Sequence, residues 1–457
     1  MSTVTPNTGP GPRRIVMFVK NSFEYDARVR KEADTLLRAG NHVVVVAIHA
    51  PGATKRHEFL DGGLEVVRVP RLYGRLGRLA GPSTVAPGAA SSRTAGTHST
   101  STAGNSVDQP AAEALPNRRS KASVFGRLRR FATTIARRGL RLAGPVARAA
   151  NTWWLDRHMV RAATLRQPQV LHAHDLNTLR PAARAAAQAG AKLVYDAHEL
   201  HRHRNDMAQI QQQRARWLEQ RLIRRVDLFI TAGDAWADYL SGLYRLPRPV
   251  VLRNVPVEAT PEPGWDLRTH LGIRAQDRIL LYQGSIQRNR GVEEAINALK
   301  HLENCVLVVA GYGAHQPALE RIAAHLGLRD RVHFFGPVPN HELLHWTASA
   351  DIGLCGIRNS SLSYYWSLPN KLFEYVMAGI PVVASDFPEM GSFVRETDVG
   401  EVCDPDDPAS IAAAVRRIID HPERRAECRQ NANVAAQEHN WTAEERKLLS
   451  AYAALTD

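Results

Sequence analysis

The sequence contains few cysteines and no long apolar run. None of its four cysteines forms a CxxC pair, and Cys305, Cys355 and Cys403 lie in or beside apolar runs, whereas Cys428 does not. Buried free thiols in a reducing compartment therefore fit better than a disulfide framework. The N-terminus has no hydrophobic signal core, and no run of about 18 apolar residues is present that could span a bilayer. These absences predict a cytoplasmic protein.

Acidic residues are missing from one strongly basic segment. Between Arg118 and Arg148 the chain carries ten lysines and arginines and no aspartate or glutamate, which accounts for most of the net charge of +14. The rest of the chain is close to charge balance. A nucleic-acid-binding protein more often spreads positive charge over a folded face with aromatic residues between the charges, and no such motif is present. We therefore expect no nucleic-acid partner.

The same segment has an apolar periodicity, and a small-residue stretch precedes it. Residues 73–117 are rich in Gly, Ala, Ser, Thr and Pro, so we expect disorder there. From Val124 to Val146, apolar residues recur at mostly three- and four-residue spacing with arginines between them, which predicts a basic amphipathic helix. Two interpretations stay open: a helix docked on its own domain, or peripheral attachment of residues 118–150 to an anionic membrane surface.

Short Val/Ile/Leu-rich runs alternate with longer helical patterns over the rest of the chain. The runs are continuous instead of alternating, which indicates strands covered on both faces, hence parallel sheets in an α/β fold. The expected strands of a first series are 15–19, 42–48, 64–69, 170–173, 192–195, 227–231 and 250–252. Those of a second series are 279–283, 306–310, 332–335, 352–355 and 381–384.

A cluster of prolines and a glycine separates the two series of strands. With 457 residues, the chain is too long for one ordinary core. We expect a first α/β domain at 13–253, interrupted by the insertion at about 73–150, then a linker at 254–277 and a second α/β domain at 278–440.

The densest chemical signal is the stretch SLPNKLFEYVMAGIPVVASD at residues 367–386. Asn370 is expected to cap a helix, whose N-terminus attracts phosphate through its unpaired N–H groups. Lys371 would add a full charge, and Glu374, one turn further on, could accept hydrogen bonds from two neighbouring hydroxyls. This combination predicts a nucleotide-sugar site, with an ordinary capped helix as the alternative.

The segment resembles the donor-binding motif of the GT-B-fold glycosyltransferases, specifically the retaining family 4 type. Further stretches agree in the same order: GSIQRNRG at 284–291, VVAGYG at 308–313 and VHFFGPV at 332–338. In the first half, residues 26–33 and 195–199 look like stretches of some family members. The similarity covers nearly the whole chain except residues 1–12 and about 73–150.

The resemblance implies two Rossmann-like domains facing a cleft, with a C-terminal helix within 441–457 that crosses back to the first domain. It also implies roles in sugar transfer with retention of configuration, for which no cofactor and no metal are expected. Arg290 and Lys371 would stabilise the leaving diphosphate, and His198 would contact the donor sugar. The implied donor-binding residues are Gly284, Ser285, Arg288, Gly311, Val338 (through its backbone), Asn370, Leu372 and Glu374.

Several alternatives stay open at this point. His198 could instead satisfy local backbone groups at a strand end, and the histidines and acids around it could be interpreted as metal ligands, although their spacing matches no metal motif. Trp366 stands where many family members have a second glutamate, and Ser285 where an arginine is usual. A nucleotide-sugar 2-epimerase of the same fold, or a degenerate donor-binding subunit of a partner transferase, therefore competes with a transferase. We expect the acceptor to be lipid-linked or part of a cell-envelope glycan.

Overall fold

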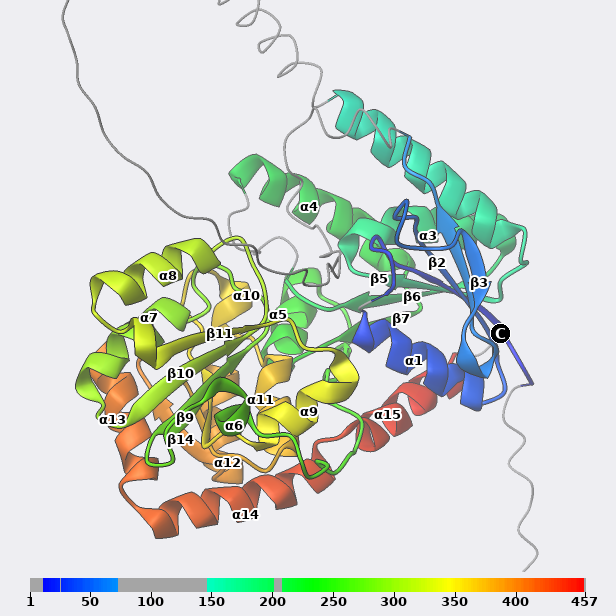
Figure 1. Ribbon diagram of the computed structural model, residues 1–457. Helices are drawn as coiled ribbons and strands as arrows, with labels where there is room; N and C mark the ends of the chain where they lie inside the picture. Colours follow the sequence, from blue (N-terminus) through cyan, green and yellow to red (C-terminus); the bar gives the residue numbers. More distant parts are fainter. Residues whose placement is uncertain (1–10, 25, 73–145, 201–207, 456–457) are drawn as a thin grey trace, which may run out of the picture.

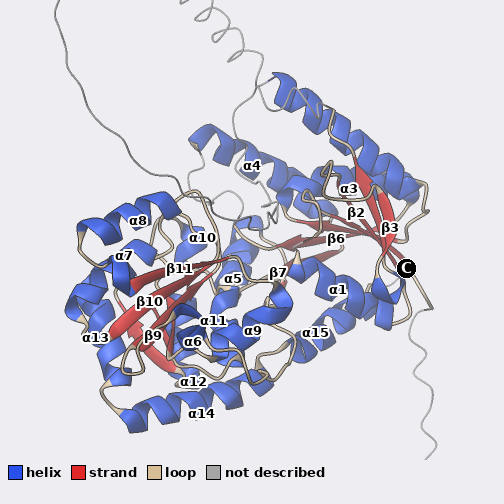
Figure 2. Cartoon of the chain, viewed as in Figure 1, coloured by secondary structure: helices blue, strands red, loops and turns tan. Residues whose placement is uncertain are grey.

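The computed structural model describes residues 11–24, 26–72, 146–200 and 208–455. They form two sheets with helices on both faces (Figures 1 and 2). The α/β class predicted from the apolar runs is confirmed. The predicted disordered stretch at 73–117 and most of the predicted basic helix lie outside the described residues.

The first sheet has eight strands in the order β3-β4-β2-β1-β5-β6-β7-β8. All neighbouring pairs are parallel except β3 and β4, so the expectation of a parallel sheet holds for all but an edge strand. The strands are β1 Arg14–Phe18, β2 His42–Ile48, β3 His57–Phe59, β4 Glu65–Val69, β5 Val170–His174, β6 Lys192–Ala197, β7 Leu228–Thr231 and β8 Val250–Val251.

The second sheet is entirely parallel, with six strands in the order β11-β10-β9-β12-β13-β14. Its strands are β9 Arg278–Gln283, β10 Cys305–Ala310, β11 Val332–Gly336, β12 Ile352–Cys355, β13 Val382–Ser385 and β14 Gly400–Cys403. The four cysteines are free and buried, as expected for Cys305, Cys355 and Cys403 from their sequence context, and Cys428 is buried as well.

Helices connect the strands and cover both sheets (Figure 2). In the first half they are residues 146–164, α1 Ala27–Arg38, α3 Leu176–Ala189, α4 Gln209–Leu222 and α5 Asp234–Tyr244. In the rest of the chain they are α6 Leu267–Leu271, α7 Val292–Ala298, α8 Gln316–His325, α9 Asn340–Ala348, α10 Leu362–Tyr365, α11 Asn370–Met377, α12 Pro388–Thr397, α13 Pro408–Ile419, α14 Pro422–Glu438 and α15 Trp441–Ala453. The stretch expected as a linker, 254–277, contains the short helix α6.

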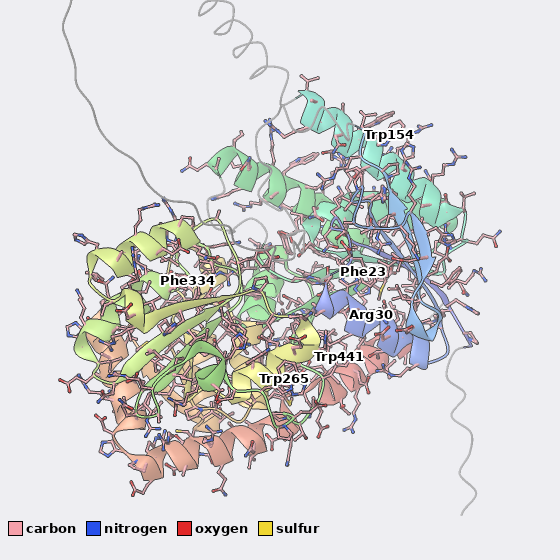
Figure 3. All side chains as sticks on the ribbon, viewed as in Figure 1. Phe23, Arg30, Trp154, Trp265, Phe334 and Trp441 are labelled. Atoms are coloured by element: carbon pink, nitrogen blue, oxygen red, sulfur yellow. The ribbon has the colours of Figure 1, made fainter. Side chains whose placement is uncertain are left out.

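The last helix, α15, lies against α1 of the first half (Figures 1 and 3). The indole N–H of Trp441 donates a 2.9 Å hydrogen bond to the hydroxyl of Thr35 on α1. The Arg13 guanidinium donates to the carbonyl oxygen of Tyr452 at 2.8 Å and to that of Leu455. These buried contacts fix the C-terminal residues on the first sheet's side of the molecule.

Each sheet has one point where the strand order reverses. In the first sheet the chain leaves β1 toward β2 on one side and later places β5 on the other side. The second sheet repeats this pattern, with β10 and β12 on opposite sides of β9. Loops at the carboxyl ends of the strands leave a crevice at such a reversal, and open α/β sheets bind their ligands there.

Candidate active site

A cavity of about 500 Å³ lies where the loops after the strands of both sheets face one another. Residues of the first half and of the second half both contribute to its wall. Its lining includes Asp26, Arg28, His198, Glu199, Gly284, Ser285, Arg290, Trp366, Asn370, Lys371 and Glu374. A second cavity of about 880 Å³ adjoins it and shares six lining residues with it: Asp26, Ala27, Asn254, Asn340, Asn370 and Glu374. Together they give room for an extended ligand.

Most of the residues predicted for the donor site line this cavity. They are His198, Gly284, Ser285, Arg290, Asn370, Lys371 and Glu374. Arg288 lines a neighbouring hollow of about 270 Å³ next to Arg290. Leu372 is buried in the core, and Val338 is half-buried against it. The functional roles assigned to all of these residues stay predictions.

The loop after β9 comes too close to the loops after β10 and β12 for side chains at the points of contact. A Cβ atom on Gly311 would lie 1.9 Å from the carbonyl oxygen of Gly284, and one on Gly291 would lie 1.8 Å from that of Gly356. Gly284 and Gly291 also have φ values of +119° and +82°, a region that favours glycine. Gly311 thus packs against Gly284 and does not itself line the cavity. Because Gly284 has no side chain, its backbone is open to a ligand.

Helix α11 begins at Asn370, with Pro369 as its N-cap. The prediction that Asn370 caps the helix is therefore wrong: Asn370 already has helical geometry, so its side chain is not in the flanking position that caps the first turn. Pro369, whose backbone is extended at φ −76° and ψ 147°, makes no side-chain cap. The first N–H groups of α11 consequently remain available at the cavity wall.

Lys371 carries its amino group into this cavity from a buried position. Nζ has no hydrogen-bond partner among the described residues and lies 3.6 Å from the centroid of the Tyr282 ring. Burial lowers the pKa of Lys371 to about 7, and the charge of Arg290 adds to this effect. Because an unpartnered buried cation is costly, the geometry favours an anionic ligand beside Nζ.

Arg290 supplies a second cation on the same wall. Its guanidinium lies over the Tyr364 ring, 4.8 Å from the centroid, and its buried Nε has no partner among the described residues. Arg290 and Lys371 therefore both line the cavity, and neither pairs with a carboxylate of the residues that the structure describes. Two such cations beside the N-terminus of α11 form an arrangement suited to a diphosphate.

Glu374 stands where the two cavities adjoin, and a chain of hydrogen bonds holds its carboxylate. The Gln283 side-chain amide donates to Glu374, and the Thr347 hydroxyl donates to the Gln283 oxygen at 2.7 Å. Burial raises the pKa of Glu374 above its usual value, against the effects of this hydrogen bond and of Lys371. Sequence reasoning missed Gln283 and Thr347, although a glutamine directly before Gly284 was a visible signal.

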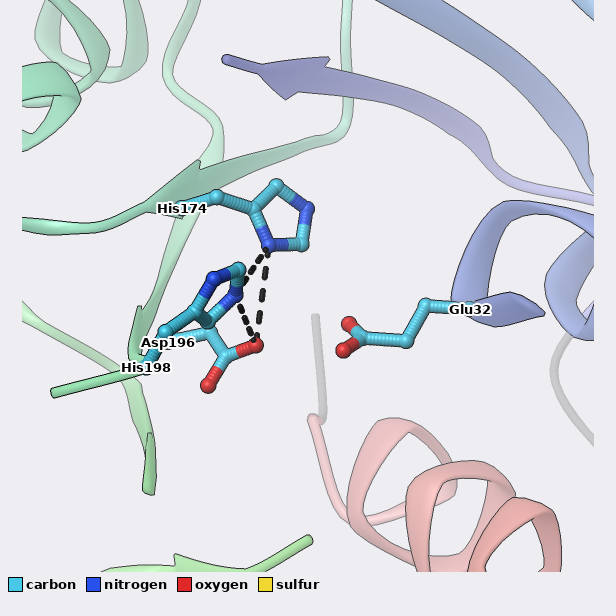
Figure 4. Close-up of side chains that lie close together, drawn as sticks. All are labelled: Glu32, His174, Asp196 and His198. Carbon is cyan, nitrogen blue, oxygen red and sulfur yellow. Dashed lines mark hydrogen bonds and ion pairs between the residues drawn. The ribbon is translucent and has the colours of Figure 1, made fainter. Parts of the chain in front are cut away.

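His198 follows β6, and among the described residues its side chain contacts carboxylates and a second histidine (Figure 4). Its Nε2 is 2.9 Å from Asp196 and 3.2 Å from Nδ1 of His174, and its Nδ1 is 4.0 Å from Asp175. Burial alone would lower the pKa of His198, but the charges of Asp196 and Asp175 raise it to about 9. The imidazole is therefore positively charged near neutral pH.

Arg28 anchors Asp196 behind this histidine. Its Nε and Nη2 each donate a 2.9 Å hydrogen bond to the carboxylate, and Nη1 donates to the carbonyl oxygen of Leu252. Atoms of Glu32, His174, Asp196 and His198 lie within 4.8 Å of one another, which is compact enough for a metal ion. However, Arg28 also pairs with Glu32 at 3.0 Å, so one guanidinium charge is already shared between the two carboxylates. The expectation that no metal binds here stays a prediction.

Trp366 lines the cavity from the second half of the chain and packs against Tyr239 on α5, with ring centroids 5.1 Å apart. Its indole thus occupies a position where the resemblance led us to look for a glutamate. An aromatic ring offers an apolar surface instead of a charged acceptor. A sugar in this part of the cavity would meet a flat hydrophobic wall.

Two family models match successive parts of this chain. Residues 265–434 match "Glycosyl transferases group 1", and residues 111–255 match "Glycosyltransferase Family 4". Together these matches cover more than half of the sequence. The chain belongs to the group 1/family 4 glycosyltransferases. The resemblance inferred from the motifs is thereby confirmed as to family.

Curated relatives match over part of their length. The chain is 30% identical to a glycogen synthase of Mycobacterium tuberculosis over 57% of this chain and 63% of that protein. It is 29% identical to a D-inositol 3-phosphate glycosyltransferase of Xylanimonas cellulosilytica over 44% of this chain and 48% of that protein. The matches therefore span less than two thirds of these relatives.

Solved GT-B structures share the fold along nearly the whole chain. Anabaena HepE in complex with UDP-glucose aligns with a TM-score of 0.67 at 16% identity, covering 97% of this chain and 100% of that one. Sucrose-phosphate synthase from Thermosynechococcus elongatus aligns with a TM-score of 0.67 at 18% identity, covering 97% and 99%. None of the helices formed by the described residues combines the length and apolar character needed to cross a bilayer.

Proposed function

We propose that this glycosyltransferase family member moves a sugar from a nucleoside-diphosphate-sugar to an acceptor. The observation that supports this most is the cavity between the two sheets. There Lys371 Nζ and Arg290 Nε lie beside the start of α11 without a hydrogen-bond partner among the described residues, and Glu374 follows one turn later. A diphosphate beside the cations would place the ribose hydroxyls near Glu374, whose carboxylate accepts a hydrogen bond from Gln283.

Charge stabilisation of the leaving group would provide most of the catalysis. As the bond between sugar and diphosphate breaks, negative charge develops on the phosphate oxygens next to Lys371 and Arg290, which lowers the barrier. The charged His198 would donate a hydrogen bond to the sugar at the opposite wall. Because the two walls come from different halves of the chain, closing the cleft would exclude water and limit hydrolysis of the donor. We further propose that configuration is retained, as the family resemblance implies.

We assign the reaction to cell-envelope polysaccharide or glycolipid synthesis on the cytoplasmic face of the membrane. The basis is the density of basic residues in 118–150, which suits an anionic bilayer in which a lipid-linked acceptor is anchored. Residues 118–145 lie outside the described residues, so this part of the proposal depends on composition and apolar spacing.

A panel of labelled nucleotide sugars, incubated with and without lipid acceptors, tests the proposed reaction. We expect label to move from one donor to an acceptor extracted with the lipid. Conversion of the donor to its epimer without an acceptor would show a nucleotide-sugar 2-epimerase instead. Tight nucleotide binding with no turnover of any donor would support a degenerate subunit, for which Trp366 and Ser285 are the sequence evidence.

A further inference from the structure

Residues 146–164, α3 and α4 cover one face of the eight-stranded sheet together with α5. Their inner sides share one apolar cluster, to which Leu155, Leu179 and Leu222 belong. Their outer sides consequently face away from the sheet in the same general direction, and Figure 1 shows α4 and the helix of residues 146–164 at the edge of the molecule. We call this outer surface, formed by residues 146–164, 176–189 and 209–222, the arginine face.

Exposed charge on the arginine face has a single sign. Its only two acids are Asp156 and Glu219, and both are buried. Asp156 pairs with Lys20 and Arg180, and Glu219 accepts hydrogen bonds from two tyrosine hydroxyls. Its eight arginines are all exposed: Arg148, Arg157, Arg161, Arg180, Arg184, Arg214, Arg216 and Arg221. A surface of this kind attracts polyanions.

Large apolar side chains are exposed among these arginines. Trp153 is 56% exposed and Trp217 is 62% exposed, and Arg157 and Arg221 lie over their respective rings. Val146 and Ile210 are exposed at the ends of their helices. An aliphatic side chain gains nothing from a phosphate backbone in water, whereas it gains free energy between acyl chains. Tryptophan beside arginine is typical of the bilayer interface.

We propose that the arginine face docks on an anionic lipid bilayer. The position of the face supports this partner, because α3 begins directly after Asp175, whose carboxylate lies 4.0 Å from His198. A bilayer against the outer side of α3 and α4 would hold the cavity close to the membrane. Docking does not depend on the proposed sugar transfer.

Vesicle flotation of the full-length protein tests this proposal. The probes are vesicles of phosphatidylcholine alone and vesicles in which about one third of the lipid is phosphatidylglycerol. We expect the parent to float with the anionic vesicles only, and less so at high salt. The variant Arg157→Glu/Arg214→Glu/Arg221→Glu should bind about a hundredfold more weakly, at roughly fivefold per arginine. Trp153→Ser/Trp217→Ser should also bind more weakly.

Matched controls separate the face from general charge effects. Lys300→Glu/Arg321→Glu/Arg329→Glu alters the net charge by the same amount as the arginine variant, but at exposed positions of the second half. Tyr312→Ser removes an aromatic ring that is 53% exposed. Both should float like the parent, and thermal melts should show that every variant is folded. Residues 118–145 are intact in all of them.

Three results would overturn the proposal. The parent could fail to bind anionic vesicles at low salt. The arginine-face variants could float as well as the parent, which would leave residues 118–145 as the only membrane contact. The parent could also bind a DNA duplex through the same arginines with no effect of the tryptophan changes, which would make the face a nucleic-acid surface.

Discussion

The side chains of Lys371 and Arg290 are the groups on which the proposed donor site depends. Each would make a charge-assisted contact with the diphosphate, worth about 1.5–3 kcal/mol. We therefore expect Lys371→Ala and Arg290→Ala each to weaken nucleoside diphosphate binding roughly 10- to 150-fold by titration calorimetry. Lys300→Ala, an exposed lysine in the same half, serves as the control. Unchanged affinity in both variants would place the diphosphate elsewhere.

The depressed pKa of Lys371 predicts a pH dependence of binding. In the free protein this amine loses its proton as the pH rises through about 7, whereas a bound diphosphate favours the charged form. Binding should therefore take up a proton above pH 7, and affinity should fall as the pH rises, by at most about tenfold per pH unit. Calorimetry in buffers of different ionisation enthalpy measures this uptake. Lys371→Ala should abolish it, and the same uptake in that variant would contradict the assignment.

Glu374 and His198 should contribute to different steps, Glu374 to donor binding and His198 to turnover. A contact with the ribose hydroxyls is made equally in the ground and transition states, so Glu374→Gln should mainly raise KM. His198 would contact the donor sugar, where charge changes as the bond to the diphosphate breaks. His198→Ala should therefore mainly lower kcat. Steady-state kinetics of both variants with one donor separate the two effects. A proportional loss of donor affinity in His198→Ala, with kcat unchanged, would contradict a role in the chemical step.

At the scale of residues, the sequence predicted positions at the ends of strands and helices better than it predicted their partners. Lys371 could be found because it lies in the first turn of a predicted helix, whereas Gly284 and the role of His198 came from the family resemblance. Arg28 could not be assigned to Asp196, because 168 residues separate them and only the fold joins them. The capping role of Asn370 was wrong for a local reason, since the proline before it takes the flanking position.

At the scale of elements, buried strands were predictable and short or polar elements were not. All twelve expected strands are present within one or two residues. The strand β3 was missed because it has three residues, none of them buried, at an edge. Helix α14 was missed because only three of its seventeen residues, Cys428, Ala432 and Ala435, are buried, so its sequence lacks a clear apolar stripe.

The segment 118–145 is the element whose role is least constrained by the fold. If it lies on a membrane, deleting it should weaken binding to anionic vesicles, since each lysine or arginine near the surface contributes about 1 kcal/mol, while the thermal melt stays unchanged. If it packs instead on the first sheet, deletion should lower the melting temperature and leave flotation unaltered. Running both assays on one deletion variant decides between these interpretations, with nucleotide binding as the control for an intact second half.

At the scale of the whole molecule, the arrangement of two sheets around a cavity followed from family resemblance and not from periodicity. Apolar runs predict that sheets form, yet they do not determine how one sheet faces another. The contact between α15 and α1 depends on pairs such as Trp441 and Thr35, 406 residues apart. The single-signed arginine face was equally invisible in the sequence, because it depends on which arginines point outward and on the burial of Asp156 and Glu219.

Release of nucleoside diphosphate from a labelled donor panel, by the parent and by Lys371→Ala, tests the central claim most directly. We expect the parent to release diphosphate from one donor in step with transfer of its sugar to acceptor. Lys371→Ala should be at least about tenfold slower at equal protein concentration and equal thermal stability, since it removes charge from the developing leaving group. Donor turnover that is undiminished in Lys371→Ala, or a panel in which no donor is bound or consumed, would contradict sugar transfer at this cavity.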